Sequence, residues 1–117
     1  ISAWMEMIKH NKPLRIDGDG SQTRDFIHVD DIVSANIFCM NYKNNFNGVA
    51  CDIGTGTSTS LSDIRNIIDN NLNVNWNEQS ARIGDIQNSK ADVKYINNLG
   101  WSPQIDIESG LKQCFGD

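Results

Sequence analysis

Apolar residues at the start of the chain recur at helical spacing, and short strand-like stretches follow. The helical pattern predicts an amphipathic helix over residues 1–11, which Pro13 ends. A short strand is expected over residues 14–17, between the proline and a glycine turn. Polar and apolar residues then alternate from Arg24 to Val29, which predicts a second strand. The chain therefore begins as a mixture of helix and strand.

A longer helix is expected directly after the second strand. Asp30 or Asp31 would cap it, since aspartate is a good N-cap residue, and it would run to about Tyr42. Its apolar stripe is expected to consist of Ile32, Val33, Ile37 and Met40. After a turn at residues 44–48, the largely apolar stretch 49–53 predicts a buried strand.

Capping residues in front of apolar periodicity indicate further helices in the second half of the chain. Residues 60–63, Ser-Leu-Ser-Asp, have the form of a capping box. The core face of the helix that follows consists of Leu61, Ile64, Ile67, Ile68 and Leu72. After a strand over residues 74–77, a similar pattern at 89–92 starts a short helix that ends at Gly100, and Asp106 caps the last helix. About five helices with short strands indicate an α/β fold of the mixed α+β type.

Composition narrows the classes of partner. The net charge is −5 and the isoelectric point is near 4.8. A nucleic-acid surface needs a basic stripe, so nucleic acid is excluded as a partner. An anionic ligand would have to be held by a few placed arginines, because the overall field is unfavourable. No apolar run reaches the length of a membrane span and no signal peptide is visible, so a membrane partner is not expected either.

Cysteine and histidine usage points to no metal and no disulfide framework. Cys39, Cys51 and Cys114 are an odd number without CxxC spacing, which favours free thiols in a reducing compartment and a cytoplasmic protein. The two histidines, His10 and His28, have no cysteine or carboxylate cluster at ligand spacing. No nucleophile–base pair can be assembled either, so no catalytic residue is proposed.

Two arginines are candidate binding residues, and each allows two interpretations. Arg24 follows a glycine-rich turn, and Arg82 lies in an otherwise polar loop. A guanidinium offers a planar fork to phosphate oxygens, so each could grip a phosphate. Alternatively, each could form an ordinary ion pair with a nearby carboxylate, and composition alone favours this second interpretation. The turn at residues 54–56, Gly-Thr-Gly, imitates a dinucleotide fingerprint, but Thr59 stands in place of its third glycine, so a tight turn is the better interpretation.

Four ordered motifs change this balance. Residues 12–31, KPLRIDGDGSQTRDFIHVDD, closely resemble the C-terminal part of the extended short-chain dehydrogenase/reductase family, the NAD-dependent nucleotide-sugar epimerases and dehydratases. Residues 52–64 resemble the next strand, turn and helix of that family. Residues 82–92, which begin Arg-Ile-Gly-Asp, resemble its substrate-binding loop, and residues 99–103 resemble its terminal signature. The resemblance covers nearly the whole chain and is strongest to the UDP-glucose and UDP-N-acetylglucosamine 4-epimerases.

In that family these segments build the smaller, substrate-binding domain. The resemblance implies that Arg24 and Arg82 grip the diphosphate of a UDP-sugar and that Asp85 binds the hydroxyls of the nucleotide ribose. The base would be read by the backbone of the strand that contains Leu14, Arg15 and Ile16. Asp17 departs from the family pattern, because tyrosine or phenylalanine is common at this position before the glycine turn.

Two family features are absent from this sequence. The family binds NAD through an N-terminal Rossmann glycine motif and catalyses with a Tyr-x-x-x-Lys pair, and neither is found here. Residues 1–117 are therefore expected to be the C-terminal nucleotide-sugar-binding domain of a larger enzyme, without NAD or activity of its own. Its expected partners are a UDP-sugar, a missing Rossmann domain in cis and further copies of itself in a homo-oligomer. The alternative is a free-standing remnant that binds nucleotide sugar or another protein without catalysis.

Overall fold

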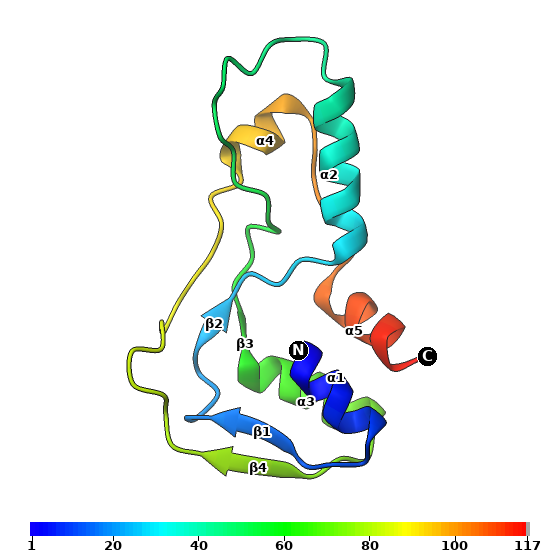
Figure 1. Cartoon of the computed structure of the whole chain (residues 1–117), viewed down its shortest axis with the longest axis vertical. Helices are drawn as coiled ribbons and strands as arrows, with labels where there is room; N and C mark the ends of the chain where they lie inside the picture. The colour runs from blue at the N-terminus through cyan, green and yellow to red at the C-terminus, as the bar shows by residue number, and fades with distance from the viewer. Residues whose placement is uncertain (117) are drawn as a thin grey trace.

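Short elements separated by long connections characterise the computed structural model, which describes residues 1–116 (Figure 1). In chain order the elements are α1 (Ser2–Lys9), β1 (Leu14–Asp17), β2 (Thr23–Arg24), α2 (Val29–Asn41), β3 (Thr59–Ser60), α3 (Leu61–Asn71), β4 (Trp76–Gln79), α4 (Lys94–Leu99) and α5 (Ile107–Phe115). Five helices and short strands in the described residues confirm the expected mixed α/β fold. The molecule is elongated, measuring 50 × 34 × 19 Å, and has two small cores.

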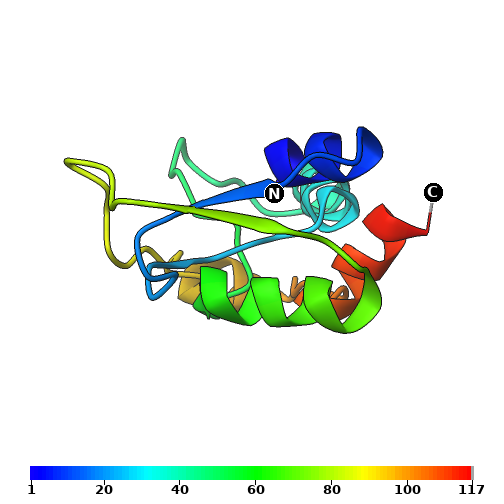
Figure 2. The ribbon, with the colours of Figure 1, turned by 90° about the horizontal axis from the view of Figure 1, so that it is seen from below.

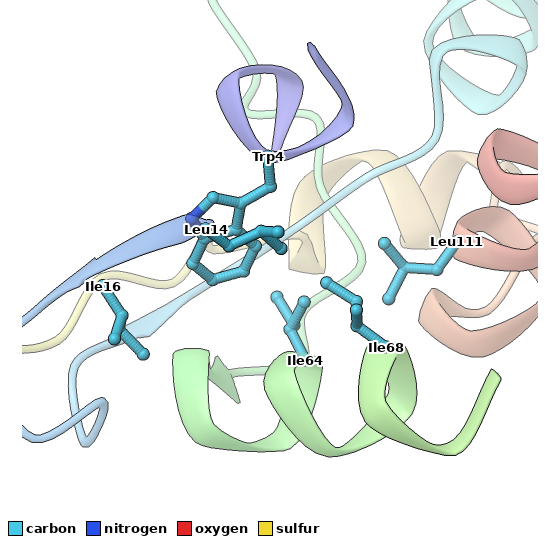
Figure 3. Close-up of a cluster of buried hydrophobic side chains, with 6 residues drawn as sticks. All are labelled: Trp4, Leu14, Ile16, Ile64, Ile68 and Leu111. Carbon is cyan, nitrogen blue, oxygen red and sulfur yellow. The ribbon is translucent and has the colours of Figure 1, made fainter. Parts of the chain in front are cut away.

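The larger core forms around a parallel pair of strands. β1 pairs with β4, with Leu14 opposite Trp76, and the pair lies between α1 on one side and α3 on the other (Figure 2). Side chains alternate along β1, so that Leu14 and Ile16 are buried while Arg15 is exposed. The buried cluster, which also draws on α5, consists of Trp4, Leu14, Ile16, Ile64, Ile68 and Leu111 (Figure 3).

The smaller core lies where α2 packs against α4 and the chain around Trp101. Ala35, Ile96 and Trp101 are buried there, and the Trp101 indole donates to Ser34 Oγ at 3.0 Å. Asp31 is only 2% exposed, and its carboxylate accepts the backbone N–H groups of residues 104 and 105, each at 3.0 Å. A buried carboxylate therefore joins the first turn of α2 to the connection that leads to α5.

Capping predictions were confirmed where the interaction is local. The Ser60 side chain accepts from the N–H of Asp63 at the start of α3, and Asp106 accepts from the N–H of Ser109 at the start of α5. Gly100 ends α4 in the left-handed conformation, with φ of 112°. In each case the partner lies within a few residues, which is why sequence spacing suffices to predict the contact.

The start of α2 was predicted wrongly. His28, not Asp30 or Asp31, is the N-cap, and its Nδ1 accepts from the N–H of Asp30 at 3.1 Å. An imidazole nitrogen offers the same acceptor as a carboxylate oxygen. The short helix α4 was also displaced from its predicted start at residues 89–92: it begins at Lys94, and Asp92 accepts from the Lys94 N–H instead.

Three of the four residues in the predicted apolar stripe of α2 face away from the core, and only Ile32 is half-buried. Val33, Ile37 and Met40 are 50%, 52% and 83% exposed, and the packed side of the helix carries Ala35 and Phe38 instead. Helical periodicity shows which residues share a face, but not which face meets the rest of the described chain.

Three strand predictions were corrected. Strand β2 ends at Arg24 rather than Val29, because its antiparallel partner β3 is only two residues long. Residues 49–53 form no strand, since within the described residues no strand offers them a ladder of hydrogen bonds. The strand predicted at 74–77 begins two residues later, as β4.

Candidate functional site

Arginine side chains gather at one cavity. It has a volume of about 570 Å³ and lies beside α1, the end of β1 and the loop that follows β4. The chain has four arginines, and three of them line this cavity: Arg15, Arg24 and Arg82. An acidic protein therefore concentrates its arginines in one place, as recognition of an anion requires.

A glycine turn anchored on α3 positions Arg24. Gly18 and Gly20 adopt φ of 76° and 79°, which side chains disfavour. The turn also packs closely on α3, since a Cβ at Gly20 would lie 2.5 Å from Ser62 Oγ. The N–H of Ser62 donates to the carbonyl of Gly20 at 2.9 Å. These contacts fix the direction in which the chain enters β2, and they thereby fix the position of the Arg24 backbone.

The loop that carries Arg82 and Asp85 is attached to β2 by backbone hydrogen bonds. The N–H of Thr23 donates to the carbonyl of Gln87 at 2.8 Å, and the N–H of Ser89 donates to the carbonyl of Thr23 at 3.1 Å. Arg24 Nη2 then reaches Asp85 Oδ1 at 2.9 Å, although the two residues are 61 positions apart in sequence. The structure thus brings together the two halves of the predicted site.

Each of the three arginines lies near a carboxylate. Asp17 lies near two of them: Arg15 Nε is 2.8 Å from its Oδ1, and Arg82 Nε is 3.8 Å from its Oδ2. With Asp85 paired to Arg24, three positive and two negative side chains line the cavity, which leaves a formal charge of +1. Arg82 is the most exposed of these arginines, with 71% of its side chain accessible.

Apolar side chains form another part of the cavity wall. Helix α1 contributes Trp4, and the chain after β2 contributes Phe26. Both also pack in the larger core. No local pattern distinguishes an aromatic residue that only fills a core from one that also borders a cavity.

Gln22 was missed by sequence reasoning. Its side chain is buried beside Arg24, and its Nε2 donates to the carbonyl of Asp17 at 2.8 Å. The only signal in the sequence is its place between the glycine turn and the arginine.

The residues of β1, the strand expected to contact the base, face either the core or the cavity. Leu14 is fully buried in the core and does not line the cavity, whereas Arg15 and Ile16 do. The carbonyl of Arg15 already accepts from the Trp4 indole at 2.6 Å.

The backbone N–H groups of the glycine turn at residues 54–56 are hydrogen-bonded to an aspartate. Asp25 accepts from the N–H of Thr55 at 3.0 Å and from that of Gly56 at 2.9 Å. Burial would raise the pKa of Asp25, but hydrogen bonds from Thr55, Gly56 and Ala91 outweigh it, so the pKa lies below its ordinary value. Because these N–H groups already have an acceptor, the turn does not fit the phosphates of a dinucleotide.

Other classes of site find no support in residues 1–116. There, no three histidine, cysteine or acidic side chains gather as a metal site would require, and no helix is long and apolar enough to cross a membrane. All three cysteines are free: Cys39 and Cys51 are half-buried, and Cys114 is exposed. Burial, followed by the neighbouring Cys39, raises the pKa of the Cys51 thiol.

Sequence comparison agrees with the motifs. Residues 1–54 match the NAD dependent epimerase/dehydratase family. A putative UDP-glucose 4-epimerase of Methanocaldococcus jannaschii is 36% identical over 110 residues, which cover 92% of this chain and 34% of that protein. The chain spans about a third of the length of the curated relatives it matches.

Solved structures of similar proteins extend the match to the fold. A UDP-glucuronic acid 4-epimerase from Bacillus cereus, in complex with UDP-glucuronic acid and NAD, has a TM-score of 0.86 and 26% identity, covering 97% of this chain and 37% of that one. A UDP-N-acetylglucosamine 4-epimerase from Methanobrevibacter ruminantium, in complex with UDP-N-acetylmuramic acid, has a TM-score of 0.84, with the same identity and coverage. In sequence and fold, this chain is therefore a relative of the NAD dependent epimerase/dehydratase family and matches the C-terminal part of these proteins.

Proposed function

We propose that the cavity binds the nucleotide diphosphate of a UDP-sugar, and that residues 1–117 serve as the C-terminal, nucleotide-sugar-binding domain of an NAD-dependent sugar epimerase, of the UDP-hexose 4-epimerase kind. One observation carries the proposal: three of four arginines line a single cavity in a chain of net charge −5. The names of the relatives and of the similar structures support the choice of a UDP-sugar.

Arg24 and Arg82 would hold the diphosphate between them. Without a ligand each guanidinium is oriented by a carboxylate, Arg24 by Asp85 and Arg82 by Asp17. A diphosphate would replace these partners with charge-assisted hydrogen bonds to a planar fork. Asp85, once released from Arg24, would be free to accept hydrogen bonds from the ribose hydroxyls. The apolar wall formed by Trp4 and Phe26 offers surface on which a base could lie.

NAD would be held by a part of the full-length protein outside these residues. When bound, NAD supplies a transient acceptor for a hydride from the sugar. The one glycine turn here that imitates a dinucleotide site has its N–H groups bonded to Asp25, so it does not fit the cofactor. The contribution of this chain would be to bind and orient the substrate.

The test is calorimetry of the full-length protein with UDP. Arg24→Ala and Arg82→Ala should each weaken binding by about 1.5–3 kcal/mol, the range for a hydrogen bond to a charged group. Arg65→Ala is the matched control, because Arg65 lies outside the cavity and pairs with Glu78. Unchanged UDP affinity in both cavity variants would contradict the proposal.

A further inference from the structure

One carboxylate, that of Asp25, joins three segments that are far apart in the sequence. It lies directly after Arg24 and accepts four hydrogen bonds. Two come from the N–H and the hydroxyl of Thr55, one from the N–H of Gly56 and one, at 3.4 Å, from the N–H of Ala91. The chain after β2, the glycine turn and the stretch before α4 therefore meet at a single side chain.

A glycine at the same junction shows independently how closely these segments approach. A Cβ placed on Gly54 would lie 2.6 Å from the Cβ of Ala91 and 2.7 Å from Oδ2 of Asp25. Real Cβ atoms do not approach other atoms so closely, so any side chain at Gly54 would push Asp25 and Ala91 apart. The junction is therefore tightly packed as well as hydrogen-bonded.

The junction lies at the end of the loop that supplies half of the anion site. Arg82 and Asp85 precede Ser89, whose N–H bonds to the carbonyl of Thr23, and Ala91 follows two residues later. Asp25 holds Ala91, while its neighbour Arg24 reaches across to Asp85 at 2.9 Å. The loop is thus attached to β2 at the same point from which Arg24 projects.

We infer that Asp25 is a positioning residue for the nucleotide site. Its ionised carboxylate keeps the loop of Arg82 and Asp85 in register with Arg24, so that both guanidinium groups face the same ligand. This role rests on the proposed function, and it concerns a residue that lies outside the arginine-lined cavity.

The first experiment is a double-mutant cycle on the full-length protein, with UDP as the probe in calorimetry. Asparagine keeps the shape of Asp25 but removes the charge and turns one acceptor into a donor. Asp25→Asn should weaken UDP binding roughly tenfold, within the range of coupling between neighbouring groups. In an Arg82→Ala background the same change should weaken binding by less than about threefold, because Arg82, the phosphate-binding group that Asp25 positions, is already gone.

A purely structural role would give a different result. Asp25→Asn would then lower the free energy of unfolding while the folded protein bound UDP normally, or it would weaken binding equally in both backgrounds; either outcome overturns the inference. A second groove, distinct from the arginine-lined cavity, is lined by Arg24, Asp25, Asp52 and Lys90 among others. Asp52→Asn is the matched control, since Asp52 is an exposed carboxylate in that groove and should leave affinity unchanged.

A milder variant covers the case in which Asp25→Asn does not fold. Thr55→Val removes only the hydroxyl donor to Asp25 and should show a smaller loss with the same dependence on Arg82. Failure of the proposed function is a separate result, because Arg24→Ala and Arg82→Ala would then leave UDP affinity unchanged. If those variants weaken binding and the Asp25 and Thr55 variants do not, only the positioning role fails.

Discussion

At the scale of single residues, aspartates organise this protein more than its composition suggests. Asp25 and Asp31 each accept backbone N–H groups from segments far along the chain, and Asp17 faces two arginines. A carboxylate that accepts several N–H groups satisfies donors that would otherwise be buried without a partner. Such roles depend on what approaches in space, so an Asp in a strand-like or helical pattern does not reveal them.

The stabilisation from Asp25 should depend on pH. Its pKa is lowered from 3.8 in the folded protein, so its contribution is fully present above that value and is lost as pH falls through the lower folded pKa. The charged groups that line the adjacent groove are Arg24, Asp52 and Lys90. Asp25→Asn should lower the free energy of unfolding by about 1–3 kcal/mol near neutral pH, the desolvation penalty of unsatisfied groups.

Urea unfolding of the full-length protein and of this variant checks the dependence. The difference between the two should be constant from pH 7 down to about pH 5 and should shrink below pH 4. A difference that grows on acidification would refute the assignment.

At the scale of elements, α3 holds the glycine turn of the site in place and also packs against the strand β1. It begins where the glycine turn packs, and its first turn holds Gly20 through Ser62 while Ser60 caps it. Ile64 and Ile68 on the same helix fill the core beneath β1. The local capping signal and the long-range packing agree here, and α3 accordingly has the predicted core face, apart from Leu72, which lies at the C-cap and outside the core cluster.

Removing the α3 cap should destabilise α3 and the larger core that it helps to form. Ser60→Ala deletes the acceptor for the Asp63 N–H and should lower the free energy of unfolding by about 1 kcal/mol. Ser58→Ala, an exposed change of the same size before the helix, should have little effect. Equal unfolding midpoints for the two variants in thermal denaturation would show that the cap contributes nothing.

At the scale of the whole molecule, the described chain buries less of itself than a compact domain. Its accessible surface is 7897 Å², against about 6,400 Å² expected for a monomer of 13.1 kDa. Its radius of gyration is 16.6 Å, against about 13 Å for a compact domain near this length. Part of the difference is the exposed apolar face of α2, formed by Val29, Val33, Ile37 and Met40.

Residues 1–117 expressed alone should therefore self-associate through this face, because apolar patches of this kind favour contact over hydration. Sedimentation velocity should show species larger than a monomer at high concentration, and Ile37→Glu should reduce them. Ile83→Glu is the matched control, since Ile83 is fully exposed on the loop after β4 and away from α2. A monomer at all concentrations, or equal effects of the two variants, would contradict the prediction.

The sequence by itself determined the features that depend on near neighbours. The caps at Ser60 and Asp106 and the C-terminal glycine at Gly100 were predicted, because each needs only residues a few positions away. The bounds of strand β1 were also predicted, from the proline before it and the glycine turn after it, although its partner β4 is distant in the sequence. The family resemblance carried by four ordered motifs also identified Arg24, Arg82 and Asp85 as candidates for one site, although the residues are far apart in the sequence.

Tertiary structure alone decided the features that need a distant partner. Residues 49–53 have the composition of a strand, but a strand exists only where another strand supplies its hydrogen bonds. The face of α2 that meets the core and the contact between Arg24 and Asp85 likewise depend on how segments pack. Periodicity describes one segment at a time, whereas burial and pairing belong to at least two.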